Sequence, residues 1–259
     1  MKFSLIVATC GRLKELGVLL DSFERQTHRD FEVIVIDQNE DLELTSVLAG
    51  RGFPLCHIRS KQGASLARNV GLRAASGDII AFPDDDCCYR ADTLAMAKSF
   101  FMANPQADAV IGKWKCCRRE EVGRYGVFRR AGTCFFFVRR HWLERVVGFD
   151  EMLGPGPGVR FQGGEDTDFL LQGMKAGLRV FRDPDIVVEH PDLPADRVAL
   201  SKAEEYGRAR MAVLRKHSFP VWFKVVNVIF PLMKFIVHPK RDRISLSMFM
   251  GRLKGLVEK

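Results

Sequence analysis

Three consecutive carboxylates, Asp84, Asp85 and Asp86, follow directly after the apolar run at residues 79–82. Adjacent aspartates repel one another, and a buried carboxylate is costly unless another group compensates its charge. Carboxylate oxygens are preferred ligands of Mg²⁺ and Mn²⁺, so a divalent cation could supply that compensation. The triplet therefore predicts a metal site at the end of a buried strand.

A second acidic group, Glu165 and Asp166, stands at the predicted start of a helix that Gly177 would end. The glycine- and proline-rich residues 152–164 before it predict a loop that is long enough to suggest a function. The helix dipole stabilises an ionised carboxylate in the first turn. Asp166 could therefore act as a general base, although ordinary capping of the helix explains the same residues equally well.

His190 follows the apolar residues 187–188 and precedes a proline. A single histidine is more often structural than a metal ligand. Beside a cation bound by aspartates, however, its imidazole could complete the coordination shell of Mn²⁺. His190 is therefore a candidate metal ligand.

The residues before these groups predict alternating strands and helices. Apolar runs at 3–8 and 31–36 flank a helix with one apolar face, formed by Leu16, Leu19, Leu20 and Phe23. Ligands of a parallel sheet collect beyond the carboxyl ends of its strands. Thr9, Arg12 and Asp37 are therefore predicted to share one crevice, although Asp37 taken alone is more typical of a plain turn.

The next elements continue this pattern. A helix over 63–72 carries Arg68, and the strand after it brings the aspartate triplet to the same edge of the sheet. The spacing then predicts a helix over 91–104, strands at 109–112 and 133–138, and another helix from 139. We expect one α/β domain over 1–195, with a Rossmann-like, mainly parallel sheet flanked by helices.

The C-terminal tail, 196–259, holds the basic surplus of the chain. Residues 197–259 contain 14 Lys/Arg against 4 Asp/Glu, in a chain whose net charge is +8. A polar, basic helix is predicted over 201–216. The apolar stretch 221–238 has one narrow polar stripe, formed by Lys224, Asn227, Lys234 and His238 with Pro231 beside it. Two lysines and a proline argue against a membrane-spanning helix and favour an amphipathic helix at a membrane interface, with packing on protein as the open alternative.

These charges favour an anionic membrane surface over a nucleic acid as partner, since the aromatic residues of the tail lie in an apolar face rather than among arginines. Seven cysteines, with vicinal pairs at 87–88 and 116–117, are typical of a reduced protein and lack the spacing of a zinc site. Residues 1–10 are too short an apolar segment for a secretion signal. We expect a cytoplasmic protein, peripheral to the inner face of the cell membrane.

Taken together, the motifs resemble those of the family 2 glycosyltransferases, which are inverting enzymes of the GT-A fold. The matching segments are residues 4–9 with Arg12, 35–37, 67–71, 84–86 and 164–168. They occur in the order and spacing of the family. The resemblance implies transfer of a sugar from a nucleoside diphosphate to a hydroxyl group, with Mn²⁺ or Mg²⁺ as cofactor.

The resemblance also implies a role for each matching residue. Those that would bind the nucleotide sugar are Thr9, Arg12, Asp37, Arg68, Asp84 and Asp85. Asp37 would hold the base and Arg68 would lie near the diphosphate. Asp86 and His190 would bind the metal. Asp166 would be the catalytic base, and Glu165 would help to hold a glycan or lipid-linked acceptor.

One segment departs from the family. Asp37 is followed by Gln-Asn-Glu, where the family commonly has Asp-Gly-Ser. A UDP-sugar is the expected donor, and a dTDP-sugar stays open.

Two other functions would use the same residues. One is a sugar nucleotidyltransferase, against which the sparse loop after residue 9 argues. The other is a non-catalytic membrane-associated module that binds sugars or nucleotides. A surface polysaccharide or glycolipid is the expected product.

Overall fold

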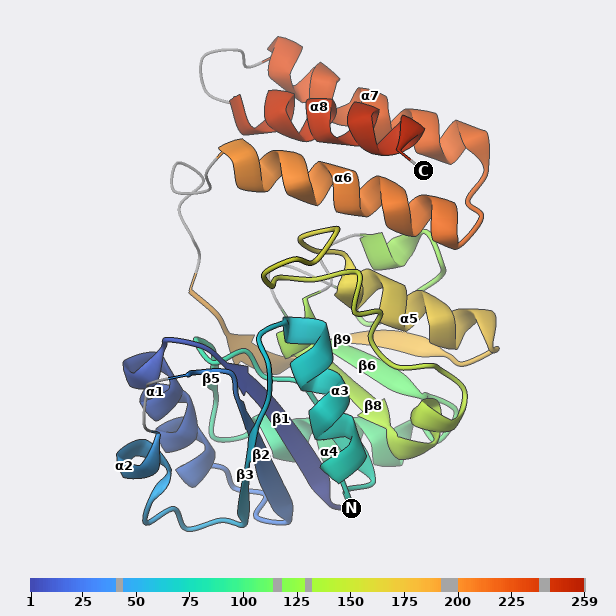
Figure 1. Ribbon diagram of the computed structural model, residues 1–259. Coiled ribbons are helices and arrows are strands. Elements are labelled where there is room, and N and C mark those ends of the chain that lie inside the picture. Colours follow the sequence, from blue (N-terminus) through green and yellow to red (C-terminus); the bar gives the residue numbers. More distant parts are fainter. Residues whose placement is uncertain (41–43, 114–117, 129–131, 192–199, 238–242, 259) are drawn as a thin grey trace.

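A computed structural model describes residues 1–40, 44–113, 118–128, 132–191, 200–237 and 243–258 (Figure 1). The strands are β1 (Phe3–Thr9), β2 (Phe31–Asp37), β3 (Leu55–Arg59), β4 (Ile79–Ala81), β5 (Cys88–Tyr89), β6 (Ala109–Lys113), β7 (Glu120–Glu121), β8 (Phe136–Arg139) and β9 (Val180–Glu189). The α-helices are α1 (Leu13–Glu24), α2 (Thr45–Leu48), α3 (Ala64–Ala74), α4 (Thr93–Ala103), α5 (Glu165–Lys175), α6 (Leu200–Lys216), α7 (Val221–Val237) and α8 (Arg243–Val257). Short 3₁₀ turns lie at η1 (Gly126–Phe128), η2 (Thr133–Phe135) and η3 (Arg140–Glu144).

The strands form one mixed sheet in the order β3-β2-β1-β4-β8-β6-β9-β5, with β7 paired to β9. Strands β3, β2, β1 and β4 are parallel, and β8 pairs antiparallel with both β4 and β6. The longest pairing aligns β1 with β2 from Phe3–Phe31 to Thr9–Asp37. The predicted α/β class with a mainly parallel sheet is confirmed, and the polar residues after β1, β2 and β4 meet at one edge.

Burial explains the apolar runs that predicted these elements. Every residue of β4 is buried, as are six of the seven residues in both β1 and β2. The predicted face of α1 is also buried: Leu16, Leu19, Leu20 and Phe23. In α3, Gly71 lies so close to Ile6 of β1 that a Cβ atom there would collide with the isoleucine side chain. The helix can therefore pack tightly on the sheet.

Two elements differ from the prediction. The predicted strand at 133–138 begins as the turn η2 and becomes β8 only at Phe136, while the helix expected from 139 is the turn η3. Strand β9 begins at Val180, well before the apolar pair 187–188. Its first half contains Arg182 and Asp183, which are buried because they pair with Glu120 and Arg119. Charges that are neutralised by partners elsewhere in the chain hide the strand from a hydrophobic pattern.

Helices α6, α7 and α8 lie together beyond the carboxyl-end edge of the sheet, with α6 across α5 (Figure 1). On α8, a Cβ atom at Gly251 would collide with the carbonyl oxygen of Glu204 on α6, and one at Gly255 would lie 2.9 Å from Met211 Cβ. The backbones of α6 and α8 therefore approach closely. The predicted domain boundary at 195/196, like Cys116, Cys117 and His238, lies outside the described residues.

Helix α7 is amphipathic, as predicted, and part of its polar side faces the protein, whereas Lys234 is exposed. Asn227 and Pro231 are buried, whereas Trp222 and Phe230 are each 59% exposed. Other exposed apolar residues of this helix are Val221, Val225, Val226, Ile229, Met233, Ile236 and Val237. Much of the apolar face is therefore exposed, although the Trp222 ring lies 5.7 Å from that of Tyr125. Among the described helices, none has the combined length and apolar character needed to cross a membrane.

Candidate active site

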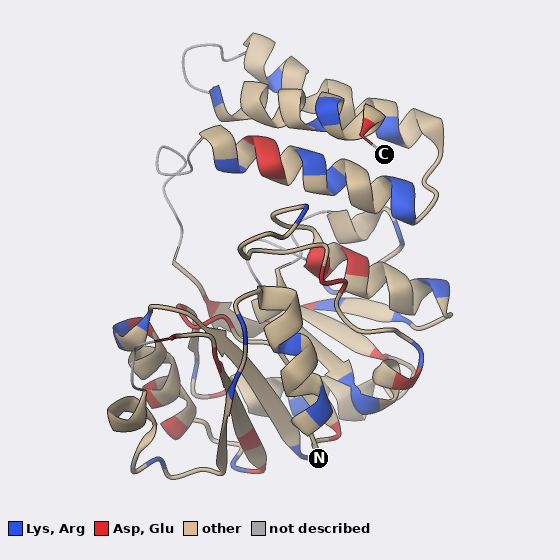
Figure 2. Ribbon diagram, in the orientation of Figure 1, with Lys and Arg blue, Asp and Glu red and all other residues tan. Residues whose placement is uncertain are grey.

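A pocket of about 740 Å³ lies between the carboxyl-end loops of the sheet and the tail helices. Eight of the predicted site residues line it: Arg12, Arg68, Asp84, Asp85, Asp86, Glu165, Asp166 and His190. Acidic segments gather in these loops and at the start of α5, while basic segments follow α6 above them (Figure 2). Residues that are far apart in the sequence thus form one polar chamber.

Two arginines share the charge of the aspartate triplet. Arg12 Nη1 donates to Asp85 Oδ1 at 3.0 Å and to Asp86 Oδ2 at 2.5 Å. Asp85 is buried and also accepts a hydrogen bond from Thr9 Oγ1 at 2.9 Å. Asp84 is paired instead with Arg68. Arg12 and Arg68 therefore compensate part of the negative charge of the triplet, for which the sequence had suggested only a bound cation.

Asp86 and His190 lie together, as a shared metal site requires. Asp86 Oδ1 is buried and accepts no hydrogen bond from the described residues, although His190 Nε2 is 3.3 Å away. The ligand atoms of Asp84, Cys134 and His190 also lie within 4.8 Å of one another. A buried oxygen without a donor beside an imidazole and a second carboxylate is a donor set that fits Mn²⁺ or Mg²⁺.

Cys134 is a site residue that the sequence did not indicate. It lies inside an apolar run, and nothing in its spacing indicated that η2 would bring its thiol to Asp84 and His190. Burial, together with the nearby charge of Asp84, raises the pKa of the Cys134 thiol well above its usual range. The thiol is therefore protonated unless a cation is bound beside it.

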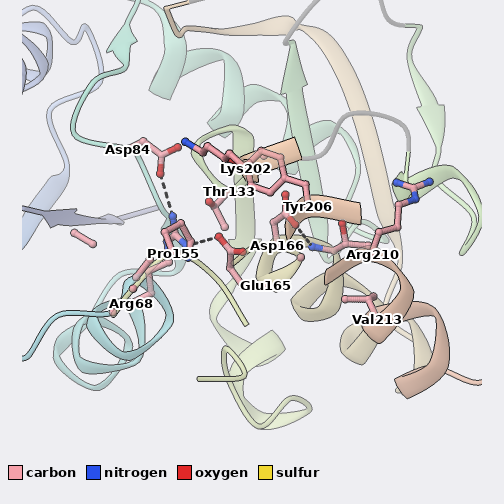
Figure 3. Close-up of a pocket in the computed structure, with 18 of the residues that line it drawn as sticks. Arg68, Asp84, Thr133, Pro155, Glu165, Asp166, Lys202, Tyr206, Arg210 and Val213 are labelled. Atoms are coloured by element: carbon pink, nitrogen blue, oxygen red, sulfur yellow. Dashed lines mark hydrogen bonds and ion pairs between the residues drawn. The ribbon is translucent and has the colours of Figure 1, made fainter. Parts of the chain in front are cut away.

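Arg68 joins the two acidic loops. Its Nη2 donates to Asp84 Oδ1 at 3.0 Å and its Nη1 donates to Glu165 Oε1 at 3.2 Å, as Figure 3 shows. The guanidinium is buried and lies 5.5 Å from the ring centroid of Phe149. The planar Arg68 guanidinium, paired with Asp84 on one side and Glu165 on the other, fixes the distance between the aspartate triplet and the start of α5.

Asp166 lies across the pocket from the triplet, in the first turn of α5 (Figure 3). Burial, reinforced by the charge of Glu165, raises the pKa of Asp166 to about 7. The backbone N–H of Thr167 donates to Asp166 Oδ1 at 2.6 Å and opposes this rise. A carboxylate with a pKa near neutrality is suited to accept a proton from a hydroxyl group.

Two glycines let the chain enter α5 under α6. Gly163 and Gly164 have φ angles of 152° and 84°. A Cβ atom at Gly163 would lie 3.1 Å from Tyr206, and one at Gly164 would lie 3.0 Å from Val213. Glycine is required here because the left-handed backbone and the close approach of α6 both exclude a side chain.

Asp168 ties α5 to the end of α6. Its carboxylate is fully buried and lies 2.8 Å from His217 Nε2 and 2.9 Å from Lys216 Nζ. Burial alone would raise the pKa of Asp168, but hydrogen bonds from His217, Lys216 and Gln172 lower it overall. This ionised, hydrogen-bonded carboxylate holds the turn that carries Asp166 against the tail.

Thr9 and Asp37 do not line the pocket as described. Thr9 instead supports Asp85, and the Asp37 carboxylate is fully buried, with Asn39 Nδ2 at 2.7 Å and His57 Nε2 at 3.0 Å. Gln38, which the sequence analysis passed over, lines the pocket and accepts a hydrogen bond from the Gly63 N–H. The side chain directly after Asp37, that of Gln38, therefore faces the pocket.

The tail contributes residues that the sequence did not indicate. Those that line the pocket are Lys202, Tyr206, Gly207, Arg210, Val213, Met248 and Arg252. No motif marks them, and the basic, apolar composition of 196–259 directed attention to membranes instead. Helices α6 and α8 are therefore part of the wall of the chamber.

Residues 4–155 match the model of glycosyl transferase family 2. An uncharacterized glycosyltransferase of Haemophilus influenzae is 35% identical over 115 residues, which are 44% of this chain and 39% of that protein. The PGL/p-HBAD biosynthesis glycosyltransferase of Mycobacterium bovis is 34% identical over 117 residues, which are 42% of this chain and 45% of the relative. These matches thus cover less than half of the curated relatives.

Two solved structures match almost the whole chain. The mannosyltransferase PcManGT from Pyrobaculum calidifontis, in complex with GDP-Man and Mn²⁺, has a TM-score of 0.74 at 18% identity and covers 99% of this chain and 87% of its own. S. aureus TarS 1-349, in complex with UDP-GlcNAc, has a TM-score of 0.68 at 19% identity and covers 99% and 82%. The family model spans more than half of the sequence, and the fold agrees with it. The chain belongs to glycosyl transferase family 2 and has the GT-A fold.

Proposed function

We propose that the protein transfers a sugar from a nucleoside diphosphate to an acceptor hydroxyl group, with inversion at the anomeric carbon. The observation that carries this proposal is the position of Asp166, whose pKa is raised to about 7, across the pocket from the aspartate triplet. A donor held at the triplet would present the face opposite its leaving group to an acceptor next to Asp166.

The donor side of the pocket would be formed by Arg12, Arg68, Asp84 and Asp85, with Thr9 hydrogen-bonded to Asp85 and with Asp37 as the residue that would hold the nucleotide base. A UDP-sugar is the proposed donor, with a dTDP-sugar as the alternative. Solved relatives are in complex with UDP, UDP-GlcNAc or GDP-Man, which supports a nucleotide sugar without deciding the base.

Mn²⁺ or Mg²⁺ is the proposed cofactor, with Asp86 and His190 as its ligands and Asp84 and Cys134 beside them. The cation would stabilise negative charge on the departing diphosphate. The complex of PcManGT contains Mn²⁺, which supports this assignment.

The chain itself would handle the proton and the acceptor. Asp166 accepts the proton of the attacking hydroxyl as the new glycosidic bond forms and the bond to the diphosphate breaks. Glu165, held by Arg68, would orient the acceptor next to that base. A single displacement of this kind inverts the anomeric configuration.

The exposed apolar face of α7 supports a peripheral position on an anionic membrane, at the inner face of the cell membrane. Trp222, Ile229 and Phe230 would enter the interface, and exposed lysines such as Lys234 would meet acidic headgroups. A glycan or lipid-linked acceptor, used for a surface polysaccharide or glycolipid, fits that position.

Calorimetric titration with UDP, dTDP and GDP, each with and without Mn²⁺, tests the donor site. We expect one nucleotide to bind with metal and to bind at least tenfold more weakly to Asp86→Ala, which removes a ligand oxygen. Absence of binding for all three nucleotides, in a protein that melts cooperatively, would contradict the proposed function.

A further inference from the structure

Two arginines on the tail side of the pocket have no carboxylate partner in the described ranges. Arg210 of α6 donates from Nε to Asn227 Oδ1 at 2.7 Å and from Nη1 to the Phe128 carbonyl oxygen at 3.3 Å. Arg252 of α8 donates from Nη1 to the backbone carbonyl oxygen of Asn227 at 2.5 Å. Both line the chamber, so two cations face it with only neutral groups as acceptors.

Burial and mutual repulsion destabilise the charged forms of Arg210 and Arg252 when no ligand is bound. Burial lowers the pKa of Arg210 to about 9, and the like charge of Arg252 adds to this effect, while the charge of Asp166 opposes it. Burial also lowers the pKa of Arg252 to about 10. The Nε atom of Arg252 is buried and donates to none of the described residues. Buried cations of this kind require a compensating negative charge.

A neighbouring arginine shows what an ordinary structural pair looks like in the same helix. Arg208 donates from Nη1 to Glu205 Oε1 at 2.7 Å and from Nη2 to Glu258 Oε1 at 2.5 Å. It does not line the pocket. Two positions further along, Arg210 faces the pocket without such a partner. On the side of α6 away from the pocket, arginine is paired with carboxylates. On the pocket side, Arg210 has no carboxylate partner among the described residues.

Asn227 holds both arginines in place. Its side-chain oxygen accepts from Arg210, its backbone oxygen accepts from Arg252, and its own Nδ2 donates to the Phe223 carbonyl oxygen at 2.8 Å. These bonds fix the guanidinium groups next to each other at the pocket wall. Asn227 also belongs to α7, so the helix with the exposed apolar face determines their position.

We propose that Arg210 and Arg252 form a subsite for a phosphate group carried by the acceptor. The inference rests on the proposed function and names the class of acceptor. Arginine forks match the oxygens of phosphate, and two of them at a water-poor wall bind a dianion better than a hydroxyl-rich sugar. The subsite lies on the tail side of Asp166, away from the aspartate triplet, so it is separate from Arg68, which would lie near the donor diphosphate.

The proposal restricts the substrate. The attacking hydroxyl belongs to a polyol phosphate or to a sugar attached to a lipid through phosphate, with the phosphate close enough to reach the arginines while the hydroxyl meets Asp166. Both sources present the same chemistry to the subsite. They differ in whether the phosphate arrives from solution or from a membrane.

The probe is glycerol phosphate, titrated by calorimetry into protein that is saturated with Mg²⁺ and the nucleoside diphosphate it binds. We expect glycerol phosphate to bind this complex, and to bind at least tenfold more weakly to Arg210→Met and to Arg252→Met. Arg208→Met is the matched control and should leave the affinity unchanged. Asn227→Leu should weaken binding as well, because it removes the acceptor that positions Arg210.

Thermal melting separates a binding defect from misfolding. Methionine fills a similar volume without a buried charge, so Arg210→Met should melt no lower than the native protein. Arg210→Gln, which keeps hydrogen-bonding groups but no charge, must show the same loss of affinity. Binding that is equal in both Arg210 variants and the native protein would overturn the proposal.

Two further results are informative. One distinguishes a lipid-borne phosphate from a soluble one, and the other distinguishes failure of the subsite from failure of the proposed function. Vesicles that contain phosphatidic acid should compete with glycerol phosphate if the subsite takes a lipid-borne phosphate, and should not compete if it takes a soluble one. Either outcome supports the subsite. Binding of the nucleotide without any binding of glycerol phosphate would overturn this inference alone, whereas failure of every nucleotide to bind would overturn the proposed function itself.

Discussion

Arg210 Nε lies 2.7 Å from Asn227 Oδ1, and this hydrogen bond joins the wall of the pocket to the helix whose outer face is apolar and exposed. Asn227, in the polar stripe of α7, is therefore used inside the protein rather than toward solvent. In this orientation α7 exposes its apolar face, which is then available to contact a membrane. The acceptor side of the pocket and the proposed membrane contact thus share one structural element.

The pH dependence of turnover should report the ionisation of Asp166. Burial and the charge of Glu165 raise the pKa of Asp166 to about 7, and only the ionised carboxylate can accept a proton. The rate of nucleoside diphosphate release should therefore rise with pH, with its midpoint near 7. A stopped-flow or coupled assay at saturating donor measures this profile, and a rate that is flat between pH 5 and about 8 would exclude Asp166 as the base.

Glu165→Gln should move that midpoint to lower pH. The substitution removes the negative charge that helps to raise the pKa of Asp166, and it leaves Arg68 free to lower that pKa further. The maximal rate should fall as well if Glu165 orients the acceptor. Measuring the profile of the variant beside that of the native protein tests the assignment, which an unchanged or raised midpoint would contradict.

Asp168→Asn should destabilise the fold without a direct effect on chemistry. The variant leaves Lys216 and His217 without their buried carboxylate, which should cost about 3 kcal/mol at neutral pH. Chemical denaturation measures this loss, and Asp21→Asn, on the exposed side of α1, is the control. A loss smaller than about 0.5 kcal/mol would mean that the buried pairing adds little stability.

The same carboxylate predicts how stability depends on acid. The folded-state pKa of Asp168 is lowered from its usual value of 3.8, so its contribution is complete above that value and is lost as the pH falls through the folded pKa. The native protein should therefore lose stability more steeply than Asp168→Asn below pH 4. Acid titrations of both proteins, followed by circular dichroism, measure this difference. A stability difference between native protein and Asp168→Asn that stays constant as the pH falls would contradict the pairing.

Ile229→Glu and Phe230→Glu should abolish binding to anionic vesicles. These side chains are 47% and 59% exposed, so a charge there leaves the fold intact but opposes entry into an apolar interface. Val18→Glu, at a site of 57% exposure on α1, is the matched control. Flotation with phosphatidylglycerol vesicles measures the effect, and equal flotation of all variants would refute membrane binding by α7.

Cys134→Ser should change the preference among cations. A thiol beside Asp84 and His190 favours softer ions, whereas a hydroxyl favours Mg²⁺. Relative to the native protein, the variant should bind Co²⁺ more weakly and Mg²⁺ equally well, as measured by competition with a fluorescent chelator. An identical ranking of cations in both proteins would remove Cys134 from the site.

The sequence predicted the sheet well because β1, β2 and β4 are continuous apolar runs that end in polar residues. It failed where pairing between distant residues replaces local pattern, as in β9, where Arg182 and Asp183 are buried by partners more than 60 positions earlier. It likewise gave no sign of Cys134 beside Asp84 and His190, or of Arg210 and Arg252 in the pocket. Their position depends on how whole helices and turns pack, which no local spacing encodes.

The most direct test of the account compares native protein with Asp166→Asn for binding and turnover of the same nucleotide sugar in the presence of Mn²⁺. Asparagine keeps the shape of the side chain but cannot accept the proton, so we predict donor affinity within about twofold and release of nucleoside diphosphate reduced by at least about 100-fold. A variant that binds the donor and turns it over at the native rate would contradict the assignment of Asp166 as the catalytic base.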